Sequence, residues 1–345
     1  MANETIENMH AGQQSLRGLV SSKFSQARAS KDLLFSDTQL ASLHSRTLHT
    51  TIQLRYCPAL KSKPSQNVTT EGKEKHAKKR FDPFKSPASE LLIARLKTHN
   101  LVLNKYPVIE NHFIAATIAD KPQSELLEED DLYVTYRCLQ AWSGDRDLKN
   151  SSALFAFFNS GEHSGASQPH RHLQFLPIED MAKGCAAEWQ PLCQSMKHGV
   201  HSASPLLENP LFPFVHLAVS LDAGMNGPTL HERYLLLVKA AFASISEVLG
   251  IANNDTVRLG SDKRTLFSYN LSMTSDLMAI LPRRAEVASI PGTNDGQIFV
   301  NGTILAGTIM VRSEDDWDRL RDEPELIQHI LQEITFPANA DPART

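Results

Sequence analysis

Hydrophobic residues in the first third of the chain recur at two different spacings. Residues 12–50 are predicted to be mainly helical, because their apolar residues lie three to four positions apart: Leu16, Leu19, Val20, Phe24, Leu33, Leu34, Leu40 and Leu43. Residues 51–56, TIQLRY, alternate between apolar and polar positions and predict a strand. Residues 61–80 contain almost no apolar side chains and carry a positive local charge, which predicts a solvated loop.

The middle of the chain predicts strands separated by turns and one helix. Residues 101–117 contain two strand-like pieces, with Pro107 and Asn111 marking the turn between them. The other expected elements are a short strand or helix at 89–96, a helix at 124–140, a buried strand at 153–158 and a returning strand at 170–176.

The last part of the chain continues this mixture. We expect low-periodicity helix or loop at 178–204, a strand at 216–221, a helix at 230–250 ended by Gly250, two strands within 267–284, a strand at 302–313, and a helix at 315–334 interrupted by Pro324. Strands and helices do not alternate as βαβ units, so the pattern favours an α+β fold over a doubly wound sheet. A weakly marked seam divides the chain into regions 1–205 and 206–345.

Composition and charge narrow the function classes. The chain has 345 residues, of which 41% are hydrophobic and 21% charged, and a formal net charge of -4, which is typical of a globular protein. Proteins that bind long nucleic acids usually carry a basic excess, so we expect small ligands or proteins as partners and no nucleic acid. No stretch approaches the roughly 18 consecutive apolar residues of a membrane span. The opening residues contain no apolar run and the four cysteines form no CxxC pair. We therefore expect a cytoplasmic protein, with the nucleus as a further location.

Residues 159–174, NSGEHSGASQPHRHLQ, carry the candidate chemistry. Alternate side chains of a strand share a face, so Gln168, His170, His172 and Gln174 are predicted to line one side and Arg171 the other. A polar face needs partners or solvent, so this strand should border a cleft or a ligand. The glycines and serines before it could form a nest of N–H groups for an anion, beside an imidazole that can attack phosphorus.

Two other interpretations of the histidine pair remain open at this point. Histidines at i and i+2 on a strand are a common zinc pattern, which would need a third ligand such as His163, His216 or a remote carboxylate. The pair could also be structural histidines with satisfied hydrogen bonds. The serine-glycine loop and Gln174, a poor zinc ligand, favour phosphate chemistry.

These residues resemble the active-site signature of fungal diadenosine tetraphosphate phosphorylases. That family is the ATP adenylyltransferase branch of the histidine triad superfamily and is related to galactose-1-phosphate uridylyltransferases. Its His-x-His-x-Gln pattern matches His170, His172 and Gln174. Further similar segments follow in the family's order between about residues 50 and 320: FDPF, LNKYPVIENHFIAAT, YNLSMT, LPRR and AGTIMVRS. The segment NGTILAG at 301–307 departs from the family's pattern, being poorer in glycine and aromatic residues, and it lies far from the histidines in sequence.

The resemblance implies a fold and a reaction. The expected fold is α+β, with a histidine triad-like antiparallel sheet and helices, enlarged by a C-terminal portion. Residues 1–205 would form the catalytic region, and residues 206–345 an ATP adenylyltransferase region that completes the nucleotide site. As a nucleotidyltransferase, the protein would attack the α-phosphorus of diadenosine tetraphosphate with His172 and release ATP. Phosphate would then remove the adenylyl group from His172 and give ADP.

The resemblance also implies roles for individual residues. His172 would be the nucleophile, with His170 orienting it and Gln174 hydrogen-bonding the substrate. The predicted substrate-binding residues are Lys63, Asn104, Lys105, Asn159, Gly165, Ala166, Ser167, Gln168, Gln174, Asn270, Met278 and Arg283. For several of them a structural role competes: Met278 could be a core residue, Lys105 and Arg283 surface cations, and Asn159 and Ser167 partners of turn backbone.

The resemblance also implies ligands, and alternative functions remain open. We expect dinucleoside polyphosphates, ATP, ADP and inorganic phosphate as ligands, no membrane association and a monomer. No protein-bound cofactor or metal is expected, and a divalent cation such as Mg²⁺ would arrive with the polyphosphate. The alternatives are a hexose-1-phosphate uridylyltransferase, a non-catalytic dinucleoside polyphosphate sensor and a zinc hydrolase.

Overall fold

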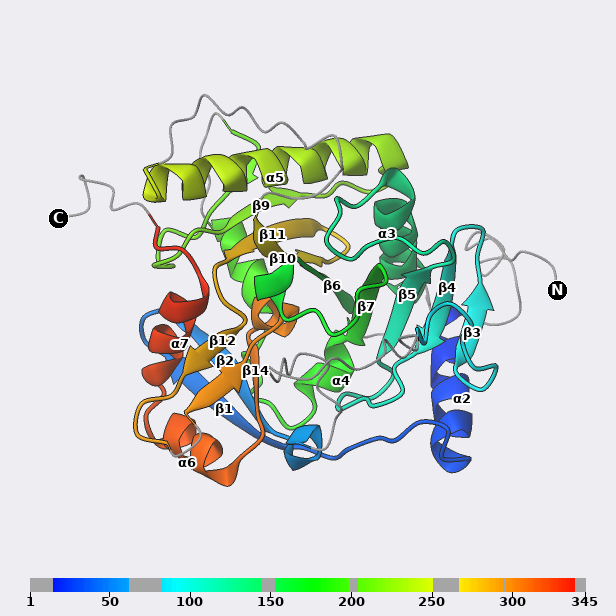
Figure 1. Cartoon of the computed structure of the whole chain (residues 1–345), viewed down its shortest axis with the longest axis horizontal. Helices are drawn as coiled ribbons and strands as arrows, with labels where there is room; N and C mark the ends of the chain where they lie inside the picture. Colours follow the sequence, from blue (N-terminus) through cyan, green and yellow to red (C-terminus); the bar gives the residue numbers. More distant parts are fainter. Residues whose placement is uncertain are drawn as a thin grey trace, which may run out of the picture.

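A nine-stranded antiparallel sheet forms the centre of the molecule (Figure 1). The computed structural model describes residues 15–61, 82–143, 153–198, 204–250, 267–293 and 296–338. In spatial order the strands are β3 (Leu92–Arg95), β4 (His99–Leu103), β5 (Phe113–Thr117), β7 (His172–Pro177), β6 (Leu154–Ser160), β10 (Ser268–Met273), β11 (Leu277–Arg283), β9 (Leu217–Ser220) and β8 (Leu206–Leu207). Adjacent strands pair antiparallel throughout.

Three helices cover one face of this sheet. They are α2 (Leu16–Ala29), α3 (Glu129–Ser143) and α5 (Gly227–Val248), and Figure 1 shows α5 lying along β9 and β11. Apolar side chains from the helices and from alternate strand positions form the larger hydrophobic core. Asn226 caps the start of α5 by accepting a hydrogen bond from the backbone N–H of Thr229, which satisfies a donor that the first helical turn leaves free.

A second layer covers the opposite face. It contains a three-stranded sheet of β1 (Gln39–Ser45), β2 (Thr50–Tyr56) and β14 (Thr308–Val311), together with α6 (Glu314–Asp322) and α7 (Leu326–Ile334). A second hydrophobic core lies between this layer and the central sheet. The shorter elements are α4 (Ile178–Ala182), η1 (Pro58–Lys61), η2 (Glu162–Ser164), η3 (Leu192–His198), η4 (Gly302–Ala306), β12 (Val287–Ser289) and β13 (Gln297–Phe299).

The predicted α+β class and antiparallel sheet are confirmed, but two predicted elements are wrong. Residues 39–45 form strand β1 instead of continuing the first helix, because they pair along their whole length with β2. The helical spacing of Leu40 and Leu43 is therefore overridden by a tertiary contact. Residues 302–306 form a 3₁₀ helix, so only the end of the predicted strand at 302–313 becomes β14. The predicted loop at 61–80 lies almost entirely outside the described residues.

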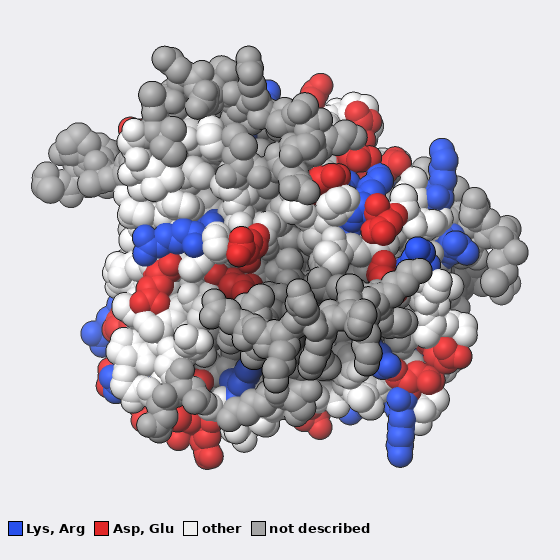
Figure 2. Space-filling view, in the orientation of Figure 1, with Lys and Arg blue, Asp and Glu red and all other residues white. Residues whose placement is uncertain are grey.

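The central sheet draws strands from both predicted regions. Strands β6 and β10 pair side by side, with Asn159 opposite Asn270, although the predicted boundary at 205/206 falls between them. The C-terminal region thus extends the same sheet, while the boundary itself stays a prediction. No helix among the described residues is both long and apolar enough to cross a membrane. On the face shown in Figure 2 acidic and basic side chains are interspersed.

Candidate active site

The central sheet forks at His172. The register between β6 and β7 ends at the pair Phe157 and Gln174, and beyond this point β6 continues with β10 on its other side. Residues 121–123 lie beside the chain preceding β7: the N–H of Arg171 donates to the carbonyl of Lys121 at 2.7 Å, and the N–H of Gln123 to that of Pro169 at 2.7 Å. Backbone groups near His172 therefore need partners from outside the sheet.

The side chain of Gln123 supplies those partners. Its Oε1 accepts from the backbone N–H of His172 at 2.8 Å, and its Nε2 lies 3.2 Å from the carbonyl of His172 and 2.9 Å from that of Asn159. The buried carboxamide thus acts as a substitute peptide group that joins the two diverging strands. Sequence reasoning missed Gln123, because a polar residue in a loop gives no periodic signal of this role.

His172 is held as a neutral imidazole with a defined tautomer. It is 2% exposed, its ring lies 5.0 Å from that of Phe84, and its Nδ1 lies 2.8 Å from the carbonyl of His170. A carbonyl can only accept, so Nδ1 carries the proton and Nε2 keeps a lone pair. Burial lowers the pKa of His172 to about 4, so the ring stays neutral at physiological pH. A neutral Nε2 is a nitrogen that can attack phosphorus.

His170 uses both ring nitrogens within the protein. Nε2 donates to the backbone carbonyl of Thr117 at 2.7 Å, and Nδ1 lies 2.7 Å from Oδ2 of Asp82. Partial burial raises the pKa of Asp82, but hydrogen bonds from His170 and from the backbone of Phe84 outweigh it and lower the pKa overall. Asp82 is thus the partner of Nδ1 of His170. His170 thereby anchors the residues that carry Phe84, and it orients His172 through its backbone carbonyl.

A cluster of metal-ligating side chains lies beside this pair, but both ring nitrogens of its histidine are already engaged, by Asp82 and by the carbonyl of Thr117. Ligand atoms of Asp82, Asp120 and His170 lie within 4.8 Å of one another. The two residues that sequence reasoning named as third zinc ligands are placed elsewhere. His163 is exposed, and both ring nitrogens of His216 bond to backbone groups, at Asn209 and Phe214.

Gln174 shares the face of His172, as the predicted alternation requires. Its Oε1 lies 3.1 Å from Nε2 of His112, and Nδ1 of His112 lies 3.1 Å from Nδ2 of Asn104. The predicted nucleotide-binding segment at Asn104 is therefore linked to the His-x-His-x-Gln strand. His112 was not named as a site residue from sequence, although it stands in the segment LNKYPVIENHFIAAT.

A second polar chain fixes Asn159. The guanidinium of Arg283 donates to Oδ1 of Asn270, whose Nδ2 donates to Oδ1 of Asn159 and to the carbonyl of Ser164, each at 2.9 Å. Oδ1 of Asn159 also accepts from the N–H of Gly302 at 2.9 Å. With its oxygen used inward, Asn159 presents its Nδ2 as a donor for a ligand.

Residues 161–168 form a loop that contains the predicted phosphate-binding run, residues 165–168. Gly161 and Gly165 adopt the left-handed backbone conformation, with φ of 86° and 76°. An added Cβ on Gly165 would lie 2.8 Å from Asn301 Cβ and from the carbonyl of Val300. The segment 300–302 thus packs directly against the loop and against Asn159, so its distance from the histidines in sequence is misleading. Of the other predicted loop residues, Ser167 is exposed and Ala166 and Gln168 are half-buried.

The remaining predicted binding residues have different fates. Met278 is fully buried in the core on the helix-covered face of the sheet, opposite the face of His172, so its predicted nucleotide contact is corrected. Arg283 is also buried. Its guanidinium donates to Asn270 and to the carbonyls of Ala285, Val300 and Ile334, so it supports the site through protein groups. Burial lowers its pKa to about 9, which leaves it charged at neutral pH. Lys105 is exposed, and Lys63 lies outside the described residues.

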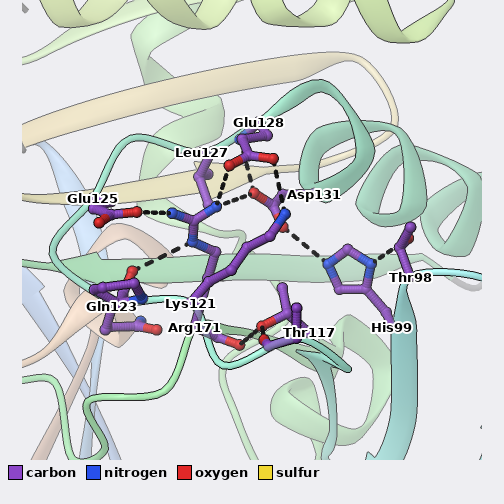
Figure 3. Close-up of polar contacts among 12 residues, drawn as sticks. Thr98, His99, Thr117, Lys121, Gln123, Glu125, Leu127, Glu128, Asp131 and Arg171 are labelled. Carbon is purple, nitrogen blue, oxygen red and sulfur yellow. Dashed lines mark hydrogen bonds and ion pairs between the residues drawn. The ribbon is translucent and has the colours of Figure 1, made fainter. Parts of the chain in front are cut away.

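Arg171 points away from the site into a charged cluster (Figure 3). Its guanidinium is fully buried and reaches Asp131 at 2.9 Å and Glu125 at 3.2 Å. Asp131, near the start of α3, also accepts from Nε2 of His99 at 3.0 Å. Burial raises the pKa of Asp131, but the hydrogen bond from His99 and the charges of His99 and Arg171 lower it overall. Because Arg171 stands between His170 and His172, this cluster fixes the alternation of the strand.

Comparisons with known proteins identify the family of this chain. A family model for the Ap4A phosphorylase N-terminal domain matches residues 6–195, and one for the ATP adenylyltransferase C-terminal domain matches residues 210–337. Among curated proteins, the Saccharomyces cerevisiae diadenosine 5',5'''-P1,P4-tetraphosphate phosphorylase 2 is 25% identical over 95% of this chain and 97% of its own length. Protein APA1 of the same organism is 26% identical over 93% of this chain and 94% of its own.

Solved structures share the fold over nearly the whole chain. Yeast Ap4A phosphorylase Apa2 in complex with Ap4A has a TM-score of 0.73 and 22% identity, covering 94% of this chain and 98% of that one. A second structure of Apa2 has a TM-score of 0.72 and 21% identity, covering 99% of this chain and all of that one. The two family models confirm the family predicted from the residues around His172. The chain belongs to the Ap4A phosphorylase family.

Proposed function

We propose that this protein phosphorolyses diadenosine tetraphosphate to ATP and ADP through an adenylyl group carried on His172. The observation that carries the proposal is the neutral, tautomer-fixed imidazole at the sheet fork of a chain that belongs to the Ap4A phosphorylase family. A yeast relative named as a diadenosine tetraphosphate phosphorylase matches nearly the whole chain.

The first step is attack by Nε2 of His172 on the α-phosphorus of a bound adenylyl group. The N–P bond forms as the bond from phosphorus to the bridging oxygen breaks, and ATP leaves. As positive charge develops on the imidazole, the carbonyl of His170 stabilises it by accepting the hydrogen bond from Nδ1. Asn159 and residues 165–168 supply donors for the phosphoryl oxygens.

The second step is attack by inorganic phosphate on the adenylyl phosphorus. The N–P bond breaks, ADP leaves and His172 returns to its neutral form. Burial of His172 beneath Phe84 favours an acceptor that the site binds over bulk water. Gln174 contributes a hydrogen-bonding amide at the third position of the pattern, where it cannot act as a proton donor to a leaving group as an imidazolium could.

Product analysis with and without phosphate tests the reaction. We expect ATP and ADP in equal amounts from diadenosine tetraphosphate when phosphate is present, and at most one turnover per active site when it is absent. His172→Ala should abolish turnover, whereas His163→Ala, which changes an exposed histidine of the same segment, should leave it unchanged. Two ADP per substrate, multiple turnover without phosphate or full activity of His172→Ala would each contradict the proposal.

A further inference from the structure

The orientation of Asn104 is fixed by its own turn. Its Oδ1 accepts a hydrogen bond from the backbone N–H of Tyr106 at 2.9 Å, so the other end of the carboxamide, Nδ2, faces His112. Nδ2 is a donor, and the nitrogen it approaches at 3.1 Å, Nδ1 of His112, must therefore be an acceptor. The contact from Nδ2 to Nε2 of His112 is longer, at 3.5 Å.

This assignment places the proton of His112 on Nε2. Nε2 lies 3.1 Å from the side chain of Gln174 and donates to its Oε1. A carboxamide has an acceptor on one side and two donors on the other, so Gln174 must turn its Nε2 away from His112. The neighbouring ring thus decides which end of the Gln174 amide is left for other partners.

The direction of the Gln174 amide matters because of where it lies. Gln174 is half-buried and stands two residues beyond His172 on the same face of β7, roughly 7 Å along the strand. An N–H₂ group there donates to phosphoryl oxygens, whereas the carbonyl end would repel them. A freely rotating glutamine would present the wrong end for part of the time.

We propose that His112 is a positioning residue, which holds Gln174 with its N–H₂ directed at the phosphoryl chain of the substrate. His112 is itself held in place, because its side chain is only 8% exposed. The residue directly precedes strand β5, and its backbone carbonyl accepts a hydrogen bond from the N–H of Asn104 at 3.0 Å. The inference rests on the proposed phosphorolysis, since it assigns a role within that reaction.

Variants at position 112 distinguish the hydrogen bond that positions Gln174 from the space that the His112 ring fills. His112→Phe keeps a planar ring but removes the donor, and should lower kcat about tenfold, with a much smaller change in KM. His112→Gln can donate to Gln174 from a similar position and should recover most of the lost kcat. Thermal unfolding of each variant shows whether the fold is kept. If His112→Phe does not fold, the inference is tested by the other two variants: kcat should remain near the wild-type value in His112→Gln and should fall in Gln174→Glu.

A double-mutant cycle with Gln174 gives the sharpest result. Gln174→Ala should lower kcat by on the order of 10²-fold. Adding His112→Phe to Gln174→Ala should cause no further loss, because no amide remains to be positioned. Gln174→Glu keeps an acceptor for His112 but directs an oxygen at the phosphates, so its kcat should fall at least as far as that of Gln174→Ala.

Three outcomes would overturn the inference. They are an unchanged kcat in His112→Phe, a double mutant whose fold loss in kcat is the product of the losses in His112→Phe and Gln174→Ala, and wild-type activity of Gln174→Glu. In each of them the wild-type enzyme still phosphorolyses its substrate. Failure of the proposed function is distinguishable, since it would already show as absent phosphorolysis in the wild-type protein and would remove this inference with it.

Discussion

At the scale of single residues, the site depends on atoms that can act only as a hydrogen-bond donor or only as an acceptor. The carbonyl of His170 can only accept, which leaves Nε2 of His172 as the nucleophilic nitrogen. Asn159 has its oxygen occupied by Asn270 and Gly302, which leaves its amide nitrogen for a ligand. Hydrogen-bond direction, more than distance, therefore defines what this site can bind.

Gly302 offers a direct test of the Asn159 contact. An added Cβ would lie 2.6 Å from Oδ1 of Asn159 and 2.7 Å from Cδ2 of Phe157, so a neighbour must move. We expect Gly302→Ala to displace Asn159, to destabilise the fold by about 1–3 kcal/mol and to lower kcat/KM by about tenfold or more. Gly227→Ala is the matched control, since its Cβ would meet nothing closer than 3.6 Å. Equal activity in the two variants, measured by steady-state kinetics, would show that Asn159 is not held this way.

At the scale of secondary-structure elements, the site exists because β6 and β7 separate. The strands pair up to Gln174 and then part, and the carboxamide of Gln123 bridges the gap. A regular sheet would use the backbone groups of His172 in the ladder and leave no room for a ligand between the strands.

Removing the bridge should weaken both stability and catalysis. Gln123→Met keeps the length of the side chain but leaves the N–H and carbonyl of His172 and the carbonyl of Asn159 without this partner. Because each buried unsatisfied group costs about 1–3 kcal/mol, we expect a loss of several kcal/mol in the unfolding free energy and a lower kcat. Gln26→Met on the exposed side of α2 serves as control. Denaturant unfolding that does not distinguish the two variants would rule out the bridge.

The sequence allowed the family and the common face of His172 and Gln174 to be predicted, but not the residues that support them. The i, i+2, i+4 spacing of His170, His172 and Gln174 gives them a common face because this segment is extended. Gln123 and His112 act through contacts with distant segments, which periodicity cannot reveal. Met278 was wrong for a reason already present in the sequence: it lies five residues before Arg283, so a regular strand puts the two on opposite faces. Strand β1 was missed because its pairing with β2 outweighs its helical spacing.

At the scale of the whole molecule, two buried neutral histidines make stability depend on pH. Burial lowers the pKa of His172 and of His216 from 6.5 to about 4. Above about pH 6.5 both histidines are neutral in the folded and in the unfolded protein, and their full contribution to the unfolding free energy is present. As the pH falls toward 4 this contribution is lost, because the histidines of the unfolded chain bind protons at a higher pH than those of the folded protein.

The unfolding free energy should therefore be lower at pH 5 than at pH 7.5, by about 2 kcal/mol for each of these histidines. Denaturant unfolding at the two pH values measures the difference. His172→Asn should reduce the pH dependence by about half of this total, whereas His163→Asn, at an exposed position, should not. Equal stability at both pH values would mean that these histidines are not buried in neutral form.

The most direct test of the central claim is mass spectrometry of the enzyme after mixing with diadenosine tetraphosphate in the absence of phosphate. We predict a mass increase of one adenylyl group on the peptide that contains His172, with one ATP released per adduct. Addition of phosphate should remove the adduct and yield one ADP. The absence of an adduct, an adduct on another residue, or an adduct that decays at the same rate without phosphate would contradict this mechanism.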